Sequence, residues 1–120
     1  PMRGQGIELL LGVTRDATFG PVLTVGLGGI WVELLKDVAL RRLPLTRIQI
    51  RAMLAQLRGL PLLKGARGGV AANLDLLVET VYRFAAAAEA LGPALVAAEV
   101  NPLLVHADRV EALDALVITE

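Results

Sequence analysis

The stretch of sequence that decides the fold is residues 94–118, ALVAAEVNPLLVHADRVEALDALVI. Its apolar residues form two runs on either side of the polar residues 106–109, a pattern typical of two strands joined by a turn. Asn101-Pro102 interrupts the first run, because proline cannot donate a hydrogen bond to a neighbouring strand. We therefore predict an antiparallel hairpin in which residues 110–118 return along the first strand.

A second hairpin is predicted near the N-terminus. Residues 7–13 are mostly apolar, residues 16–21 are rich in turn formers, and residues 22–26 return to β-branched side chains. Two such runs around a turn form a hairpin. We expect extended backbone to continue as far as Leu43, which precedes Pro44.

Two helices are predicted between the hairpins. The first covers residues 47–57, with Thr46 as its N-cap, and the second covers residues 74–91, where apolar side chains recur at helical spacing. Strands and helices come in blocks and do not alternate, so we predict an α+β fold: a mainly antiparallel sheet with both helices packed on one face. A chain of 120 residues is expected to form a single domain over residues 1–120.

The composition excludes several classes of partner and site. Hydrophobic residues make up 55% of the chain, and 12 basic residues balance 12 acidic ones. A neutral chain has no general attraction for nucleic acid or for an anionic membrane, so we expect neither as a partner. The absence of cysteine excludes disulfides, thiolate catalysis and Cys-ligated zinc. The single histidine, His106, falls in the predicted turn, where we expect it to face solvent.

The same sequence predicts a cytoplasmic protein with a covered apolar surface. Its start has no signal-peptide pattern, and no apolar run approaches the roughly 20 residues of a membrane-spanning helix. High apolar content without net charge weakens the repulsion between molecules in solution. We therefore expect a partner, or another copy of the chain in a homo-oligomer, to cover part of the surface.

The residues most able to carry chemistry are Glu99, Asn101 and Asp114. In a strand, side chains two positions apart share a face, so Glu99 and Asn101 project together, and the hairpin brings Asp114 near Asn101. A carboxylate beside an amide oxygen suits Mg²⁺, which binds few protein ligands and keeps its other positions for water and phosphates. The alternative is a solvated face of an edge hairpin with a bulge at Asn101-Pro102, and spacing alone favours this alternative.

Nearly the whole chain resembles one family, the C-terminal part of the ATP-grasp region of ADP-forming acyl-CoA synthetases and of related synthetase/acetyltransferase fusion proteins. The matching segments occur in order and with sensible spacing. They are GIELLLGVTRD (6–16), FGP (19–21), GLGGI (26–30), VELL (32–35), DV (37–38), RLPL (42–45), GARG (65–68), EVNPL (99–103) and DA (114–115).

The resemblance implies a fold that clamps Mg-nucleotide between two α+β lobes, of which this chain is the C-terminal one. It implies an enzyme that interconverts acyl-CoA, ADP and phosphate with the free acid, CoA and ATP, through an acyl phosphate and a phosphohistidine. By similarity, Asn101 and Asp114 would ligate Mg²⁺ on the phosphates of ATP or ADP. Glu99 matches a catalytic acidic residue near the phosphohistidine, and Glu8 follows the hinge that meets adenine and ribose.

A complete family member has parts that this sequence lacks: the preceding ATP-grasp lobe, and the CoA-binding and ligase domains with the phosphorylated histidine. His106 does not occupy a matching position. We therefore expect these parts to be the partners of the chain, and the chain to be inactive alone. Two other functions stay open, a regulatory ATP-grasp module of a protein acetyltransferase and a non-catalytic dimerisation domain.

Overall fold

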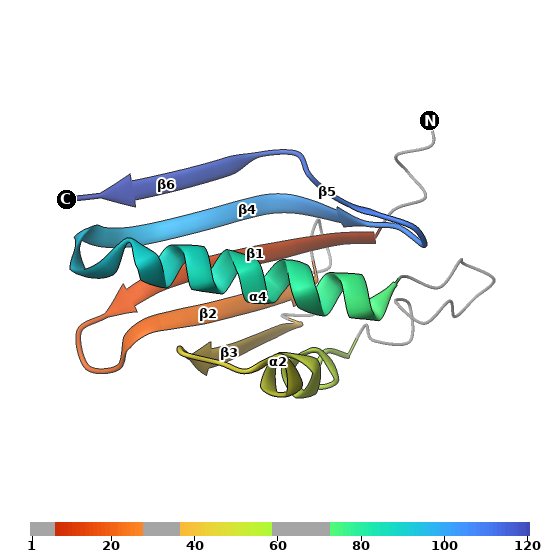
Figure 1. Cartoon of the computed structure of the whole chain (residues 1–120), viewed down its shortest axis with the longest axis horizontal. Helices are drawn as coiled ribbons and strands as arrows, with labels where there is room; N and C mark the ends of the chain where they lie inside the picture. The colour runs from red at the N-terminus through yellow and green to blue at the C-terminus, as the bar shows by residue number, and fades with distance from the viewer. Residues whose placement is uncertain (1–6, 28–36, 59–72) are drawn as a thin grey trace.

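The computed structural model describes residues 7–27, 37–58 and 73–120 of the chain. Its elements are β1 (Ile7–Asp16), β2 (Gly20–Leu27), β3 (Val38–Arg42), α2 (Arg47–Leu54), α4 (Leu74–Ala90), the 3-10 turn η3 (Gly92–Ala94), β4 (Leu95–Val105), β5 (Val110–Ala112) and β6 (Ala115–Thr119). Both helices lie on one face of the antiparallel sheet (Figure 1), so the predicted α+β architecture is confirmed.

The strands follow the order β3-β2-β1-β4, and both β5 and β6 pair with the other edge of β4. The two predicted hairpins are therefore present, as β1–β2 and as β4 with its two returning strands. The long strand β4 pairs with β1 along most of its length. The two hairpins thus meet at the centre of a single sheet.

The C-terminal hairpin differs from the prediction in two ways. The predicted break at Asn101-Pro102 is a bulge inside one continuous strand, because Leu9 faces Leu103 and Leu11 faces Val100, which leaves two residues of β4 opposite one of β1. The Asn101–Pro102 peptide bond is cis. The returning strand, predicted as one, divides into β5 and β6.

The first helix is shorter than predicted. It ends at Leu54 and not at Leu57, because the N–H groups of Gln56 and Leu57 bond to carbonyls three residues back, a pattern that tightens the chain out of the α-helix. The N-cap at Thr46 is confirmed and forms a reciprocal capping box with Gln49. The GARG segment (65–68) named in the family resemblance lies outside the described residues.

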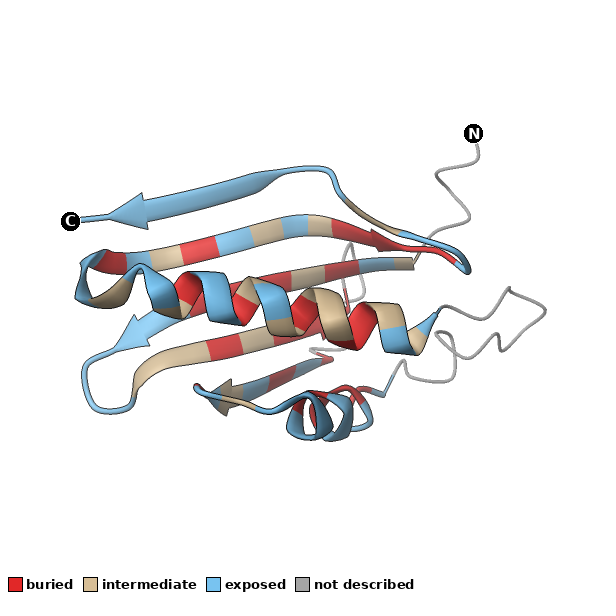
Figure 2. Ribbon diagram, viewed as in Figure 1, coloured by how far each residue is buried: buried red, intermediate tan, exposed pale blue. Residues whose placement is uncertain are grey.

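The core lies between the sheet and the two helices (Figure 2). Alternate residues of β1 and β2 point into it, as the period of two in a strand requires. Its main residues are Leu9, Leu11, Val13, Leu23, Val25, Leu27, Ile50, Met53, Leu54, Leu77, Val78, Val81, Ala85, Ala88, Leu95, Ala98, Leu103 and Val105. Neither of the two described helices, α2 and α4, lies on the opposite face of the sheet (Figure 1).

Ion pairs on the surface join the two helices. Arg47 Nε lies 2.7 Å from Glu79 Oε1, and Arg83 Nε lies 2.9 Å from Glu79 Oε2. The pKa of the Glu79 carboxyl is lowered to about 2, mainly by the hydrogen bond from Arg47 and next by the one from Arg83. Arg51 pairs in the same way with Asp75 at the start of α4. The orientation of α2 against α4 is thus fixed by charge outside and by apolar packing inside.

His106 is buried, so the expectation that it faces solvent was wrong. Its side chain is 7% exposed, and its Nε2 lies 2.9 Å from Oε1 of Glu111. The His106 N–H donates to the Arg109 carbonyl at 2.8 Å, and the His106 carbonyl accepts from the Asn73 N–H at 3.3 Å. The turn between β4 and β5 is therefore tied to Asn73, the N-cap of α4, and Glu111 supplies the polar partner that a buried imidazole needs.

No helix in the described ranges is long and apolar enough to cross a membrane.

Two isoleucines of α2 form a matched test of the core. Ile50 is fully buried and Ile48 is 82% exposed. We expect Ile50→Ala to lower the free energy of unfolding by about 2–5 kcal/mol, since it leaves a cavity, whereas Ile48→Ala changes it by less than about 0.5 kcal/mol. Urea unfolding followed by circular dichroism measures both, and equal losses would contradict the packing described above.

The His106–Glu111 contact predicts a difference between two substitutions. Glu111→Ala removes the acceptor of a buried ring and should lower the free energy of unfolding by about 1–3 kcal/mol. Glu111→Gln keeps a carbonyl acceptor and should lose less than half of that amount. The same urea experiment checks this, and a Glu111→Ala variant as stable as the wild type would show that the contact contributes nothing.

Candidate functional site

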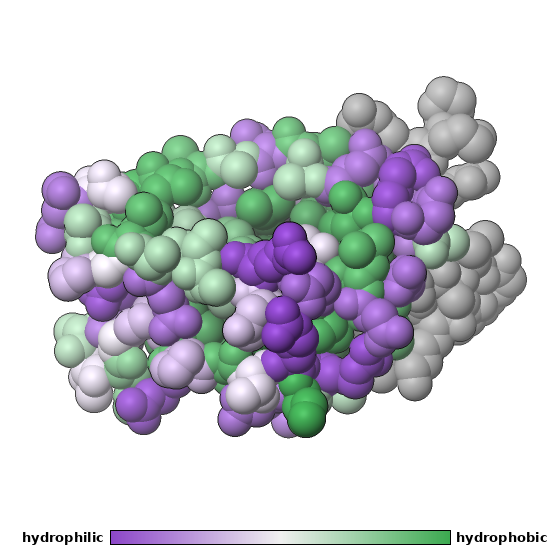
Figure 3. All heavy atoms as spheres, in the orientation of Figure 1, coloured by the Kyte–Doolittle hydropathy of each residue, from purple (hydrophilic) through white to green (hydrophobic). Residues whose placement is uncertain are grey.

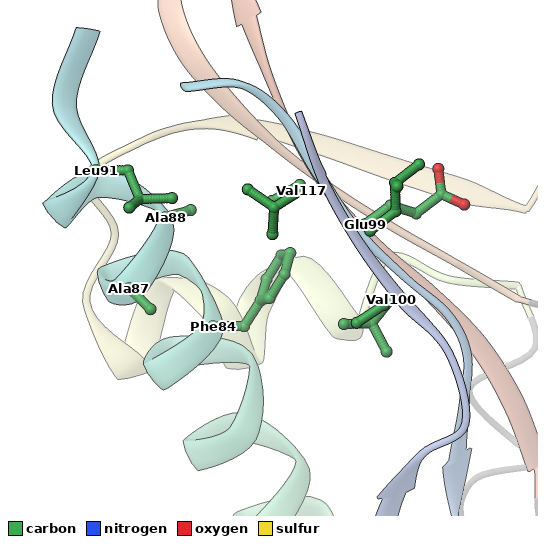
Figure 4. A pocket seen from close by; sticks show the side chains of 10 residues that line it. Phe84, Ala87, Ala88, Leu91, Glu99, Val100 and Val117 are labelled. Carbon is green, nitrogen blue, oxygen red and sulfur yellow. The ribbon is translucent and has the colours of Figure 1, made fainter. Parts of the chain in front are cut away.

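The candidate site lies on the face of the sheet that points away from the helices. Along β1, Leu9 and Leu11 enter the core, so Glu8 and Gly12 belong to the opposite face. Glu99 of β4 lies opposite Gly12 in the ladder and shares its face. Figure 4 shows the Glu99 side chain pointing away from α4. The positions of the predicted site residues can therefore be compared on this one face of the sheet.

Asn101 and Asp114 are direct neighbours across two strands. The Asn101 N–H donates to the Asp114 carbonyl at 3.1 Å, and the Leu113 N–H donates to the Pro102 carbonyl at 3.1 Å. Both Asn101 and Asp114 are exposed. Because residues directly opposite in an antiparallel ladder project to the same face, their side chains leave the backbone side by side. The predicted proximity of these two residues is present in the structure.

Local irregularities of the sheet place this pair. Asn101 lies in the bulge of β4, and Asp114 lies in the short interval between β5, which ends at Ala112, and β6, which begins at Ala115. Bulges bend a strand and re-aim a side chain relative to the regular pleat. The sequence feature responsible is Pro102, which has no N–H to continue a regular ladder. The interruption of the regular ladder at Pro102 therefore also positions the candidate ligands Asn101 and Asp114.

Glu99 precedes Asn101 by two residues, the spacing that turns side chains of a strand to the same face. Its neighbours across the ladder are Gly12, which has no side chain, and Leu116. Glu99 is exposed, and the ion pairs found among the described residues include neither Glu99 nor Asp114. Two carboxylates on one surface without a cationic partner in that part of the chain form a local negative field.

Glu8 lies on the same face but farther along the sheet. It is exposed and faces Leu104, which in turn faces Glu111 of β5. Leu104 is three positions beyond Asn101, a separation of about 10 Å along a strand. The structure therefore places Glu8 on the surface of the other candidates and outside direct reach of Asn101.

The side-chain oxygens available here fit Mg²⁺ better than they fit a metal ion whose ligands all come from the protein. Among the described residues, no group of three or more histidine, aspartate or glutamate side chains gathers around one point. Mg²⁺ commonly binds through one or two protein oxygens and keeps the rest of its octahedron for water and phosphate. The amide oxygen of Asn101 and the carboxylate of Asp114 meet that requirement.

The sequence analysis missed Glu111 as a residue of this surface. It lies opposite Leu104, on the face that carries Glu8, and its carboxylate contacts His106 at 2.9 Å and Arg109 at 3.6 Å. The sequence feature that could have identified Glu111 was its spacing from His106 around the predicted turn, which makes the two residues near neighbours across a hairpin. The contact fixes the start of the segment that carries Asp114.

Comparisons with known proteins show which family the chain is similar to. A family model described as an ATP-grasp domain matches residues 1–119. The chain is 36% identical over 113 residues to the β subunit of acetate–CoA ligase (ADP-forming) I from Pyrococcus furiosus, a match that covers 94% of this chain and 48% of that subunit. It is 37% identical over 124 residues to acetate–CoA ligase (ADP-forming) II from Archaeoglobus fulgidus, over 98% of this chain and 17% of that protein.

A solved structure shares the fold. The dinucleotide-forming acetyl-coenzyme A synthetase 1 of Candidatus Korarchaeum cryptofilum, in complex with coenzyme A and Mg-AMPPCP, superposes with a TM-score of 0.88 at 29% identity. The match covers 96% of this chain and 54% of that one. The chain thus spans about half the length of the Pyrococcus subunit and of the Korarchaeum chain.

The family match over nearly the whole chain and the shared fold lead to one conclusion. The chain belongs to the ATP-grasp domain family, and its relatives there include ADP-forming acetyl-CoA synthetases.

Proposed function

We propose that the chain is the Mg-nucleotide-binding C-terminal lobe of an ADP-forming acyl-CoA synthetase. The observation that carries the proposal is the cross-strand pair of Asn101 and Asp114 at the bulge of β4, on the face of the sheet opposite α2 and α4. Both residues are exposed on that face, where they could meet a ligand and a second lobe. The Korarchaeum relative, solved with Mg-AMPPCP, supports a nucleotide and a divalent cation as the ligands.

In this proposal Asn101 and Asp114 hold Mg²⁺ on the phosphates of ADP or ATP. When bound, Mg²⁺ would neutralise charge on the phosphates and align them for phosphoryl transfer. The carboxylate of Asp114 contributes charge, and the amide oxygen of Asn101 contributes a neutral ligand that adds no repulsion toward the phosphates. Their backbone hydrogen bond of 3.1 Å holds the two residues beside each other, which reduces the reorganisation needed on binding.

Glu99 is proposed as the catalytic carboxylate. It is exposed, it is two positions from Asn101, and no ion pair in the described part of the chain engages it. A carboxylate in that place can accept a hydrogen bond from an imidazole N–H and so hold the ring of a phosphohistidine in one tautomer and orientation. The phosphohistidine itself would come from another part of the enzyme.

Glu8 is proposed to bind the nucleoside end of the nucleotide. It lies on the same face, about 10 Å along the sheet from Asn101. That separation suits a ligand whose phosphates and ribose bind at different points of the surface. A carboxylate accepts hydrogen bonds from ribose hydroxyl groups.

We also propose that catalysis requires protein outside these 120 residues. The second ATP-grasp lobe would cover the face opposite α2 and α4 and enclose the nucleotide, and CoA-binding and ligase domains would supply the acyl group and the phosphorylated histidine. Since the chain spans 48% of the Pyrococcus subunit, the relatives contain the length that such partners need. Alone, the chain is expected to bind nucleotide weakly and to produce no acyl-CoA.

The metal pair can be tested with the chain alone. We expect Mg²⁺ to strengthen ADP binding in calorimetry, and we expect Asn101→Ala or Asp114→Ala to weaken Mg-ADP binding at least tenfold, about 1.4 kcal/mol. In the presence of ADP, Mn²⁺ used in place of Mg²⁺ should broaden the amide NMR signals of residues 101 and 114 first. This second readout reports the site even where affinity is low.

Asp108→Ala is the matched control for this experiment. Asp108 is an exposed acid of the same hairpin, but it pairs with Arg109 at 3.1 Å and lies outside the candidate site. Its substitution should leave Mg-ADP binding unchanged. Paramagnetic broadening that is centred elsewhere, or that survives both site substitutions, would rule out Asn101 and Asp114 as the metal ligands.

A further inference from the structure

The last strand of the sheet has an edge without a partner. Among the residues that the structure describes, β6 pairs only with β4. All five of its residues are exposed, with Leu116, Val117 and Ile118 at 59%, 56% and 46%. Natural proteins usually protect such an edge with a charged residue, a proline or a bulge. The sequence Ala-Leu-Val-Ile-Thr has no charge and no proline, so this edge lacks two of these protections.

An apolar groove runs beside this edge. It has a volume of about 300 Å³ and lies between β6 and the C-terminal half of α4 (Figure 4). Phe84, Ala87 and Leu91 form its helix wall, and Ala98, Val100 and Val117 form its sheet wall. Figure 3 shows hydrophobic side chains gathered over this part of the molecule. The groove lies on the helix face of the sheet; Glu99 also belongs to its lining, but the Glu99 side chain points away from α4.

The backbone of β6 is oriented to accept another strand. The Asp114 carbonyl accepts from Asn101, and the Glu120 N–H donates to the Ala94 carbonyl at 2.9 Å, so even-numbered residues face β4. The alternation of an antiparallel ladder turns the N–H and carbonyl groups of Ala115 and Val117 outward. Since opposite residues share a face, a side chain placed opposite Val117 by an added strand would enter the groove.

The charges at the ends of β6 select the kind of strand. Asp114 precedes it and Glu120 follows it; both are exposed, and neither belongs to an ion pair found in the described ranges. A second copy paired antiparallel about Val117 would place Asp114 opposite Glu120 at both ends. Like charges directly opposite destabilise a ladder. The ends of β6 therefore disfavour self-pairing and favour a strand with basic ends.

We propose that β6 and the adjacent groove bind an extended segment of another protein by strand addition. The segment has apolar residues at alternate positions, which fill the groove, and lysine or arginine at its ends, which meet Asp114 and Glu120. Main-chain hydrogen bonds along Ala115 and Val117 supply affinity, and the groove and the terminal charges supply selectivity. This surface shares Asp114 with the proposed metal pair, so the carboxylate of Asp114 would face both a basic end of the segment and Mg²⁺.

The test uses a synthetic peptide, acetyl-KKVTVTVKK-amide, and a matched peptide in which glutamate replaces every lysine. We expect the lysine peptide to bind in fluorescence anisotropy and to slow hydrogen exchange at the amides of Ala115 and Val117. The glutamate peptide should bind at least tenfold more weakly. Failure of the lysine peptide to protect these two amides at saturation would overturn the proposal.

Two variants separate strand addition from adhesion to apolar surface. Val117→Pro removes an outward N–H while leaving the ladder to β4, and it should abolish binding; a proline is tolerated at such edge positions. Leu91→Gln alters the groove without changing the strand and should weaken binding at least fivefold. Wild-type affinity in both variants would overturn the proposal. Protection of Val117 that rises with protein concentration and without peptide would replace the proposed partner with a second copy.

Discussion

The pairing of β4 with strands on both of its edges is the constraint on which the rest of the structure depends. One edge holds β1 and the N-terminal hairpin, and the other holds β5 and β6. The bulge at Asn101-Pro102 shifts the register with β1 at the same point where the opposite edge passes from β5 to β6. A regular β4 would bring neither Asn101 nor Asp114 to its present place. The position of the candidate site thus follows from the pairing of neighbouring strands with one irregular strand, β4.

Sequence patterns were sufficient to predict the elements that have a strong apolar repeat or clear capping and terminating residues. The 3.6-residue repeat of α4 and its stop at Gly92-Pro93 predicted that helix almost to the residue, and the capping residue Thr46 marked the start of α2. The end of α2 could not be read, because a change from α-helical to tighter hydrogen bonds leaves the residue types unchanged. The division of β5 from β6 depends on pairing with β4, which is a tertiary property.

The site was only partly readable for the same reason. Strand alternation brought Glu99 and Asn101 to one face, and a turn at 106–109 brought Asp114 close, so local geometry was enough to predict that three residues meet. The burial of His106 depends on Asn73 and Glu111, which come from a helix cap and a returning strand. The identity of a single residue in a turn does not show which distant residues will pack against it. The chemistry of the surface, in contrast, rested on the family resemblance and not on spacing, which alone favoured a solvated edge.

The strand β6 physically connects the proposed metal pair with the proposed strand-addition surface. Its inner edge continues the ladder that begins at Asn101 and Asp114, and its outer edge is the surface proposed to receive another strand. An edge strand whose residues are all exposed has few buried contacts to hold it in place, which is typical of the less stable parts of a fold. A partner on the outer edge would order β6 and, through it, the backbone of Asp114. Any such coupling must act in both directions, because a ligand that orders Asp114 would favour the partner by the same free energy.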